Sequence, residues 1–328
     1  MSISHKNGNT MQENILVTGG CGYVGSMLVP ALLDANHSVT VIDNQWFGNY
    51  LKPHHNLSIN KMDTRDLSEF DLIGFTRIIH LANIANDPSV DLDPTLSWEV
   101  NVLATQQLIE KSLLSRDIKQ FIFASSGSVY GVKEELDVTE ELNAVPISAY
   151  NKTKIIAERV IKSYSDKVKV HNIRPGTVCG LSPRMRLDVA VNLLTFQAIE
   201  KGKITVLGGN QTRPNIHIKD MVSVYLHFLN FFETLGSGEY NAGFENISII
   251  DIAKMVRSQI DCEIEILPSN DPRSYRQNSD KLLGTGFLPK YSVMNAITEI
   301  KEAHNRGELR DSDDFHTINK MKKLLDLT

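Results

Sequence analysis

The sequence contains few cysteines, with only three among its 328 residues. Cys21, Cys179 and Cys262 form an odd set without a CxxC spacing, which argues against both a disulfide framework and a zinc site. Isolated thiols of this kind are typical of a reducing compartment. We therefore expect a cytoplasmic protein that holds no metal.

Long apolar runs and an excess of positive charge are missing as well. No stretch approaches the roughly 18 apolar residues of a membrane span, and the most apolar one, 228–232, contains Asn230. The first 14 residues lack the apolar core of a signal peptide. The net charge is −5 and there is no dense basic block, whereas binding to nucleic acid needs a basic face. We expect neither a membrane nor a nucleic acid as a partner.

The composition is that of an ordinary globular protein, with 41% hydrophobic and 22% charged residues. In the first half of the chain, apolar runs rich in β-formers alternate with helical periodicity. The expected strands are 15–19, 38–43, 77–82, 119–126 and 169–175, and the expected helices are 23–35, 95–115 and 149–164. This alternation predicts an α/β fold with a Rossmann-type, doubly wound parallel sheet.

After residue 180 the alternation loosens, which indicates a second, smaller lobe. Ser248 and Asp251 resemble a capping box and predict the start of a helix. We assign 12–179 to a dinucleotide-binding domain and 180–328 to an interleaved substrate-binding lobe, with about 214–244 returning to the first domain. The other elements expected in this lobe are helices at 187–201, 293–305 and 315–326 and strands at 204–207 and 215–219.

A glycine-rich segment closes the first expected strand and opens the first expected helix. Its Gly19, Gly22 and Gly25 supply a tight turn, room for a pyrophosphate beside backbone N–H groups, and close helix–strand packing. Asp43 ends the second strand, where a carboxylate accepts hydrogen bonds from ribose hydroxyls and repels the extra phosphate of NADP. The sequence therefore predicts NAD as the cofactor. Asp63 keeps two possible roles, contact with the adenine or the N-cap of the next helix.

Two further motifs carry chemistry. Tyr150 and Lys154 form a YxxxK pair, and residues four apart lie on one face of a helix. A phenol is a poor base at neutral pH, and we expect the nearby ammonium to lower its pKa. Ser126 ends the strand 119–126, at the sheet edge where doubly wound folds bind ligands. Its alternative role is that of a serine in an ordinary turn.

These motifs together resemble the extended short-chain dehydrogenase/reductases, specifically the NAD-dependent epimerase/dehydratase group that acts on nucleotide sugars. The resemblance spans about 15–300 and rests on TGGCGYVG, Asp43, HLA at 80–82, Asn101 in EVNVLAT, SSGSVYG, YNKTK, RPGTVCG, QTRPNIHIKD and DPRSYR. It implies a nucleotide-diphosphate sugar as the substrate. It also implies a homodimer formed through the helices at 95–115 and 149–164, although both helices could instead pack only on the sheet.

The resemblance also implies roles for single residues. Ser126, Tyr150 and Lys154 would form the catalytic triad, and the planar fork of Arg213 would hold the substrate diphosphate. The expected cofactor-binding residues are Gly19, Gly22, Tyr23, Val24, Gly25, Asp43, Asn44, Asp63, Leu81, Ala82, Asn101, Tyr150 and Lys154. The other expected substrate-binding residues are Asn86, Ser126, Thr177, Arg186, Asn192 and Arg273, with Arg184 as a further candidate. Arginines also serve as surface ion-pair partners, and Asn86 could instead cap a loop.

The subclass depends on the acid and base groups near the sugar, because every reaction of the group begins with hydride transfer to NAD. In relatives that remove water, decarboxylate, or epimerise C3 and C5, an acidic residue or a cysteine stands just before Val-Tyr-Gly. Here these positions are Gly127 and Ser128, and a serine hydroxyl is a poor base. The sequence favours a 4-epimerase, with a 4-dehydrogenase or 4-ketoreductase as the alternative. It favours a 4,6-dehydratase or a non-catalytic NAD-sensing protein less.

Overall fold

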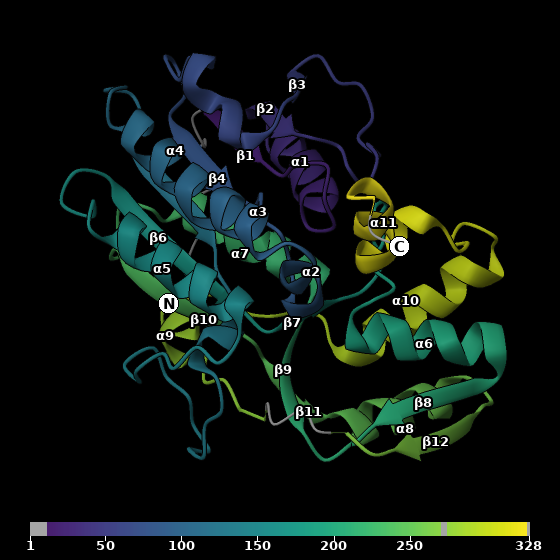
Figure 1. Cartoon of the computed structure of the whole chain (residues 1–328). Helices are drawn as coiled ribbons and strands as arrows, with labels where there is room; N and C mark the ends of the chain where they lie inside the picture. The colour runs from purple at the N-terminus through teal and green to yellow at the C-terminus, as the bar shows by residue number, and fades with distance from the viewer. Residues whose placement is uncertain (1–11, 270–273, 327–328) are drawn as a thin grey trace, which may run out of the picture.

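The computed structural model describes residues 12–269 and 274–326. Within these residues, a parallel sheet of seven strands forms the centre of the larger lobe (Figure 1). The spatial order is β3-β2-β1-β4-β5-β6-β10, so the order reverses between β1 and β4. The strands are β1 (Asn14–Thr18), β2 (Ser38–Asp43), β3 (Leu57–Lys61), β4 (Arg77–His80), β5 (Gln120–Ala124), β6 (Lys169–Pro175) and β10 (Gly238–Ala242). The predicted fold class, α/β with a Rossmann-type sheet, is confirmed.

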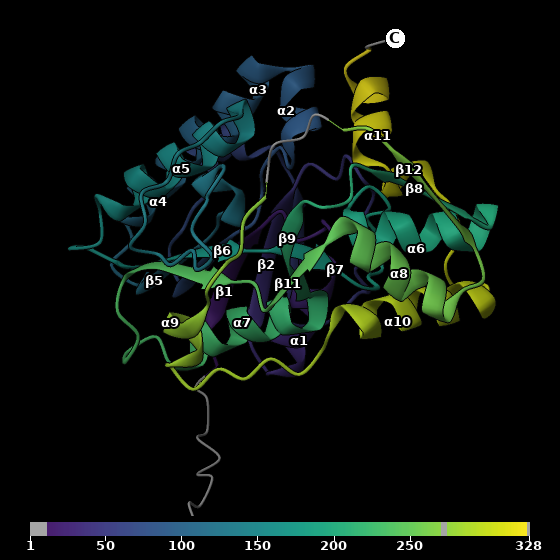
Figure 2. The same ribbon diagram turned by 90° about the horizontal axis from the view of Figure 1, so that it is seen from below.

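Helices cover both faces of this sheet (Figures 1 and 2). Helices α1 (Gly25–Asp34) and α7 (Ile218–Asn230) pack together on one face, and α4 (Ala104–Ser112) and α5 (Ala149–Lys162) pack on the other. Alternate residues of β1 therefore enter different cores: Ile15 and Val17 contact the α1 and α7 side, and Leu16 the α4 and α5 side. A strand buried on both faces is apolar throughout, which is why these strands could be recognised from the sequence.

The expected helix at 95–115 is interrupted in the structure. It consists of α3 (Pro94–Trp98), a π-helical turn (Glu99–Leu103) and α4, and α2 (Asp87–Leu92) precedes it. The π-helical turn carries Asn101, whose amide oxygen accepts the N–H of Ile84 at 2.7 Å and whose amide nitrogen donates to the carbonyl of Ile84 at 3.1 Å. Apolar periodicity does not reveal such a turn, because the residues on either side remain helical.

The second lobe contains a three-stranded and a two-stranded sheet covered by helices. The helix expected after Ser248 is confirmed. The hydroxyl of Ser248 accepts the N–H of Asp251 at 3.2 Å and caps this helix, α8. The strand expected at 215–219 instead ends at His217, because α7 begins at Ile218. The elements are β7 (Thr177–Cys179), β9 (Thr212–His217) and β11 (Glu245–Ser248); β8 (Lys203–Leu207) and β12 (Glu263–Leu267); and α6 (Ala190–Lys201), α8 (Ile249–Gln259) and α10 (Val293–Asn305).

The short helices are α9 (Asp280–Leu283) and α11 (Thr317–Leu324), and the 3₁₀ helices span Thr64–Glu69, Gly127–Tyr130 and Asp313–Phe315. Sequence periodicity missed α7, β10 and the half-exposed strands β3, β11 and β12. Strand β10 pairs with β6 at the edge of the large sheet, so the chain returns to that sheet after entering the second lobe.

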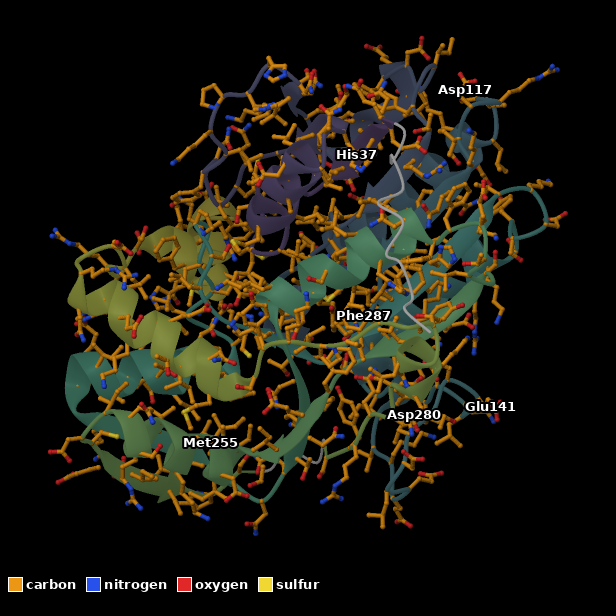
Figure 3. All side chains as sticks on the ribbon, turned by 180° about the vertical axis from the view of Figure 1, so that it is seen from behind. His37, Asp117, Glu141, Met255, Asp280 and Phe287 are labelled. Carbon is orange, nitrogen blue, oxygen red and sulfur yellow. The ribbon has the colours of Figure 1, made fainter. Side chains whose placement is uncertain are left out.

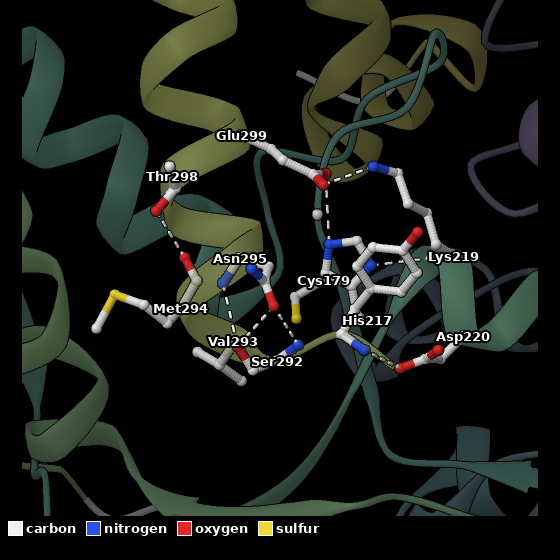
Figure 4. Close-up of polar contacts among 12 residues, drawn as sticks. Cys179, His217, Lys219, Asp220, Ser292, Val293, Met294, Asn295, Thr298 and Glu299 are labelled. Carbon is white, nitrogen blue, oxygen red and sulfur yellow. Dashed lines mark hydrogen bonds and ion pairs between the residues drawn. The ribbon is translucent and has the colours of Figure 1, made fainter. Parts of the chain in front are cut away.

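Polar contacts join α10 to the start of α7 (Figure 4). Glu299 of α10 accepts a hydrogen bond from Lys219 Nζ at 2.6 Å and lies 3.4 Å from His217 Nε2. The carboxylate of Asp220 accepts the N–H groups of Lys290 and Tyr291, each at 2.9 Å. These contacts fix the chain that leads into α10.

Figure 3 shows the side chains on the side of the molecule opposite to that of Figure 1. Phe287 is buried near the middle of this view, with its ring stacked on Phe244 at a centroid distance of 5.6 Å. The acidic residues Asp117, Glu141 and Asp280 are exposed; in this view Asp117 lies at the upper right of the molecule, and Glu141 and Asp280 lie to the lower right of Phe287. Among the residues that the structure describes, no helix is both long and apolar enough to cross a membrane.

Candidate active site

A cavity of about 410 Å³ lies at the carboxyl ends of the central strands. It occupies the point where the strand order reverses, which is the ligand-binding position of doubly wound sheets. Most of the residues expected from the sequence line it. They are Gly19, Gly22, Tyr23, Val24, Gly25, Asp43, Asn44, Asp63, Leu81, Ala82, Asn86, Ser126, Tyr150, Lys154, Thr177, Arg186 and Arg213.

Two expected residues that the structure describes are not part of this wall. Asn101 is buried behind it and holds the backbone of Ile84. Asn192 is also buried, and its amide nitrogen donates to Tyr23 Oη at 3.0 Å and to the carbonyl of Arg186 at 2.9 Å. Both residues thus support the wall from behind. Arg273 lies outside the described residues.

The glycine-rich turn brings backbone atoms very close together. Gly19 has a φ of +72°, and a Cβ on it would lie 2.6 Å from the backbone nitrogen of Ala82. A Cβ on Gly25 would lie 2.5 Å from the carbonyl oxygen of Gly20. Side chains are excluded at both positions, and a pyrophosphate can therefore approach the start of α1. This part of the cavity fits a dinucleotide.

We predict that the substitution Gly25→Ala lowers the affinity for NAD. The added methyl group would push α1 away from the turn, and overpacking of this kind costs about 1–3 kcal/mol, which corresponds to a loss of about 5-fold to 150-fold in affinity. Calorimetric titration with NAD measures the effect. Gly236→Ala is the matched control, because the nearest atom to its new Cβ, Tyr240 Oη, is 3.9 Å away. Equal affinities for the two variants would contradict the prediction.

Two carboxylates lie at the cofactor end of the cavity. Asp43 accepts the N–H groups of Cys21 at 2.9 Å and Gln45 at 2.7 Å; burial raises its pKa, and these two hydrogen bonds oppose the rise. Asp63 accepts the N–H of Arg65 at 2.9 Å and caps the 3₁₀ helix that follows. The capping role of Asp63 is thus confirmed, and its contact with the adenine stays a prediction.

Ser126, Tyr150 and Lys154 meet at the end of β5. Ser126 caps the 3₁₀ helix that follows β5, while Tyr150 and Lys154 lie one turn apart on α5. Lys154 Nζ lies 5.9 Å from the centre of the Tyr150 ring and donates to the carbonyl of Ala124 at 2.7 Å. A hydrogen bond from Ser126 favours the ionised form of Tyr150. The three side chains therefore form one cluster on the cavity wall.

The pKa of Tyr150 differs from the expectation. Burial raises it to about 12, although the hydrogen bond from Ser126 and the charge of Arg186 oppose the rise. The charge of Lys154, which we expected to lower this pKa, does not outweigh the effect of burial. Burial also lowers the pKa of Lys154 to about 7, and the carboxylate of Glu158 partly offsets this. Desolvation therefore dominates both groups.

A buried ion pair that sequence reasoning missed lies behind this cluster. Arg174 of β6 donates to Glu158 of α5 through Nε at 2.9 Å and Nη2 at 2.6 Å. Ser125 also donates to Glu158, and Arg174 Nη1 donates to Tyr130 Oη at 2.8 Å. Glu158 stands four residues after Lys154 on the same helix, a spacing that could have identified it.

The loop before Val129 carries no carboxylate. Ser128 Oγ lines the cavity, donates to Asn151 Oδ1 at 2.7 Å and lies 2.8 Å from Ser126 Oγ. Its hydroxyl is thus part of the hydrogen-bond network around Ser126. Gly127 and Ser128 therefore supply no carboxylate that could act as an acid or base for the removal of water.

The C-terminal helix contributes to the cavity, which the sequence did not indicate. Thr317 and Met321 of α11 line it, and both are buried. Arg184 Nη2 lies 3.4 Å from Thr317 Oγ1, and its guanidinium carbon lies 4.3 Å from the centre of the Phe47 ring. The wall thus includes residues separated by most of the chain.

The chain is similar to a known family and to proteins of known activity. Residues 15–243 match the NAD dependent epimerase/dehydratase family. A putative UDP-glucose 4-epimerase of Methanocaldococcus jannaschii is 29% identical over 247 residues, which are 72% of this chain and 81% of that protein. A UDP-glucose 4-epimerase of Halalkalibacterium halodurans is 27% identical over 314 residues, 87% of this chain and 93% of that protein.

A solved structure is similar over most of its length. It is a UDP-glucuronic acid 4-epimerase from Bacillus cereus in complex with UDP-glucuronic acid and NAD. The two chains are 26% identical with a TM-score of 0.77, and the match covers 89% of this chain and 99% of that one.

Proposed function

Because the chain belongs to the NAD dependent epimerase/dehydratase family, we propose that it is an NAD-dependent 4-epimerase of a nucleotide-diphosphate sugar. The observation that carries the proposal is the cluster of Ser126, Tyr150 and Lys154 on the cavity wall, beside a loop without a carboxylate. Oxidation and reduction at C4 need this cluster and the cofactor. The 4-epimerases among the similar proteins support the same reaction.

The glycine-rich turn, Asp43 and the segment after β4 would hold NAD. When bound, NAD accepts a hydride from C4 of the sugar and returns it. Gly19, Gly22 and Gly25 leave the start of α1 open to the pyrophosphate, and Asp43 accepts hydrogen bonds from ribose hydroxyls. Lys154 donates to a ribose hydroxyl, which links the cofactor to the catalytic cluster.

The reacting hydroxyl of the sugar exchanges its proton with the protein. Tyr150 Oη takes the proton of the C4 hydroxyl and later gives it back. Ser126 Oγ forms a hydrogen bond with the same sugar oxygen, and the charge of Lys154 stabilises the phenolate. Arg213 holds the diphosphate, and Asn86 and Thr177 contact the sugar.

A 4-epimerase must present both faces of C4 to these residues, which requires no additional acid or base. This agrees with Gly127 and Ser128 in place of carboxylates. The alternative function is that of a 4-dehydrogenase or 4-ketoreductase, which uses the same residues and releases the keto sugar.

A panel of UDP-, GDP- and dTDP-sugars tests the proposal. We expect one of them to return with inverted configuration at C4 by NMR, with no lasting absorbance of reduced nicotinamide. Accumulation of reduced nicotinamide together with a 4-keto sugar would instead establish the alternative. Loss of water from the sugar would contradict both.

A homodimer remains a prediction. Trp98 and Leu103, on the segment that the family resemblance places at the interface, have exposed fractions of 38% and 53%, which supports a covering partner. A monomeric mass in solution would contradict the dimer. The three cysteines are free thiols, which supports the cytoplasm as the compartment.

A further inference from the structure

The loop between β7 and α6 lies directly on the start of α1. Ser182 Oγ donates to the carbonyl of Tyr23 at 2.8 Å and lies 2.9 Å from Ser26 Oγ. The backbone N–H of Arg184 donates to Ser26 Oγ at 3.4 Å. All four residues are buried. The second lobe therefore places one of its own arginines beside the glycine-rich turn, where a pyrophosphate can approach α1.

The guanidinium of Arg184 is buried on the wall of the cavity with few partners. Its exposed fraction is 3%, and it lines the cavity. Its Nε has no hydrogen-bond partner among the described residues, and Nη2 makes a long hydrogen bond of 3.4 Å to Thr317 Oγ1. Burial and the charge of Arg186 lower its pKa to about 10, so it remains charged at neutral pH. Because a buried charge is costly without a counter-charge, this position favours an anion.

The nearby carboxylates have other partners. Asp188 accepts two hydrogen bonds from Arg186, at 3.0 and 3.1 Å. Asp314 pairs with Lys320 at 2.7 Å. Both carboxylates act on Arg184 at longer range and partly offset the effect of burial. In the described part of the chain neither forms an ion pair with Arg184, so the donors of its guanidinium remain available to a ligand.

The electrostatic contacts of Arg184 and Arg186 point to different ends of the cavity. The charge of Arg184 acts on Asp43, at the cofactor end, where it opposes the rise of the pKa through burial. The charge of Arg186 acts on Tyr150. The ring of Phe47, which follows β2 as Asp43 does, lies 4.3 Å from the guanidinium carbon of Arg184, and such a contact holds a guanidinium in place. Arg184 therefore belongs to the cofactor end.

The glycine-rich turn itself carries no cation. Residues 18–25 contain neither lysine nor arginine, so the turn offers only backbone N–H groups and the helix dipole to a negatively charged pyrophosphate. Among the described residues, three other cations line the cavity. Lys154 stands beside Tyr150, and Arg186 is already paired. Arg213 is assigned to the diphosphate of the sugar under the proposed function.

We propose that Arg184 binds the pyrophosphate of NAD together with the glycine-rich turn. The planar fork of a guanidinium donates to phosphate oxygens in pairs. The second lobe thus contributes a cofactor ligand, and bound NAD connects the two lobes. The inference rests on NAD as the cofactor and does not depend on inversion at C4. The diphosphate of the nucleotide sugar offers the same chemistry, so the test separates the two ligands.

The test uses Arg184→Met, which keeps a long side chain and removes its charge. We expect the affinity for NAD to fall at least tenfold in calorimetric titration, because a charge-assisted contact is lost. Raising the NaCl concentration should weaken the binding of NAD less in the variant than in the wild type. At saturating NAD, the affinity for UDP should stay within about threefold of the wild type, because the variant keeps Arg213.

Thermal unfolding of the NAD-free protein distinguishes a ligand contact from structural support. Arg184→Met removes a buried charge without an ion-pair partner, so the melting temperature should stay the same or rise. Arg77→Met is the matched control, because Arg77 is also buried but pairs with Glu13 at 2.7 Å and does not line the cavity. We expect this control to lower the melting temperature and to leave the affinity for NAD unchanged.

The outcomes separate this inference from the proposed reaction. Equal affinities for NAD in Arg184→Met and the wild type would overturn the role of Arg184, and so would weaker binding of UDP alone. A melting temperature lowered as much as in Arg77→Met would also overturn it, because it would show a structural role. None of these results affects the 4-epimerase. Weaker binding of NAD in Arg184→Met, with no sugar inverted at C4 by the wild type, would support Arg184 and contradict the 4-epimerase.

Discussion

The variant Tyr150→Phe is expected to lose about 10²–10⁴-fold in kcat, the usual contribution of a general acid and base. The phenyl ring keeps the packing of α5 and removes only the oxygen that exchanges a proton with the C4 hydroxyl. The affinity for NAD and for the nucleotide sugar should therefore stay within a few fold. Steady-state kinetics and calorimetric titration measure the two effects separately.

Tyr291→Phe is the control for this prediction. Its ring stacks on His217 at a centroid distance of 5.0 Å, and the residue does not line the cavity. We expect full activity from this variant. A Tyr150→Phe enzyme with more than one tenth of the wild-type kcat would show that another group moves the proton.

The variant Glu158→Gln is expected to lose activity in a pH-dependent manner. The carboxylate of Glu158 raises the pKa of Lys154, which burial lowers to about 7, so its removal lowers this pKa further. The lysine is charged below its pKa and neutral above it, and only the charged form stabilises the phenolate of Tyr150. The activity relative to wild type should fall about twofold near pH 6 and about tenfold near pH 9. A pH profile of kcat measures this.

Other titratable and charged groups near Lys154 could also affect the pH profile of kcat. His80 of β4 also faces Lys154, but burial lowers its pKa to about 3, so it stays neutral over this range. Arg174 of β6 pairs with Glu158 and would lose its counter-charge in the variant. Tyr150 is a further titratable neighbour of Lys154, and the titrations of the two groups are coupled.

The same substitution should also destabilise the fold by about 3–5 kcal/mol, because it leaves a buried guanidinium unpaired. The double variant Glu158→Gln, Arg174→Gln removes both charges and should recover part of the thermal stability. It should keep a lowered Lys154 pKa, since the carboxylate is still missing. A parallel pH profile for wild type and Glu158→Gln would exclude an effect of Glu158 on Lys154.

The sequence alone determined five of the seven strands of the central sheet and most of the cavity wall. The strands were recognisable because parallel strands buried on both faces are apolar along their whole length. The YxxxK spacing placed Tyr150 and Lys154 on one helix face, since residues four apart are neighbours there. Gly19 and Gly25 marked the turn because no other residue fits so close to the backbone. All of these signals are local.

The tertiary structure decided which polar groups face the cavity and what charge they carry. Asn101 and Asn192 have the residue type of a ligand contact, yet each is buried behind the wall with backbone partners. The pairing of Glu158 with Arg174 depends on the packing of α5 against β6. Burial, and not the neighbouring ammonium, set the pKa of Tyr150. Desolvation and contacts between distant segments depend on how the elements pack together, and the spacing of residues along the chain does not encode them.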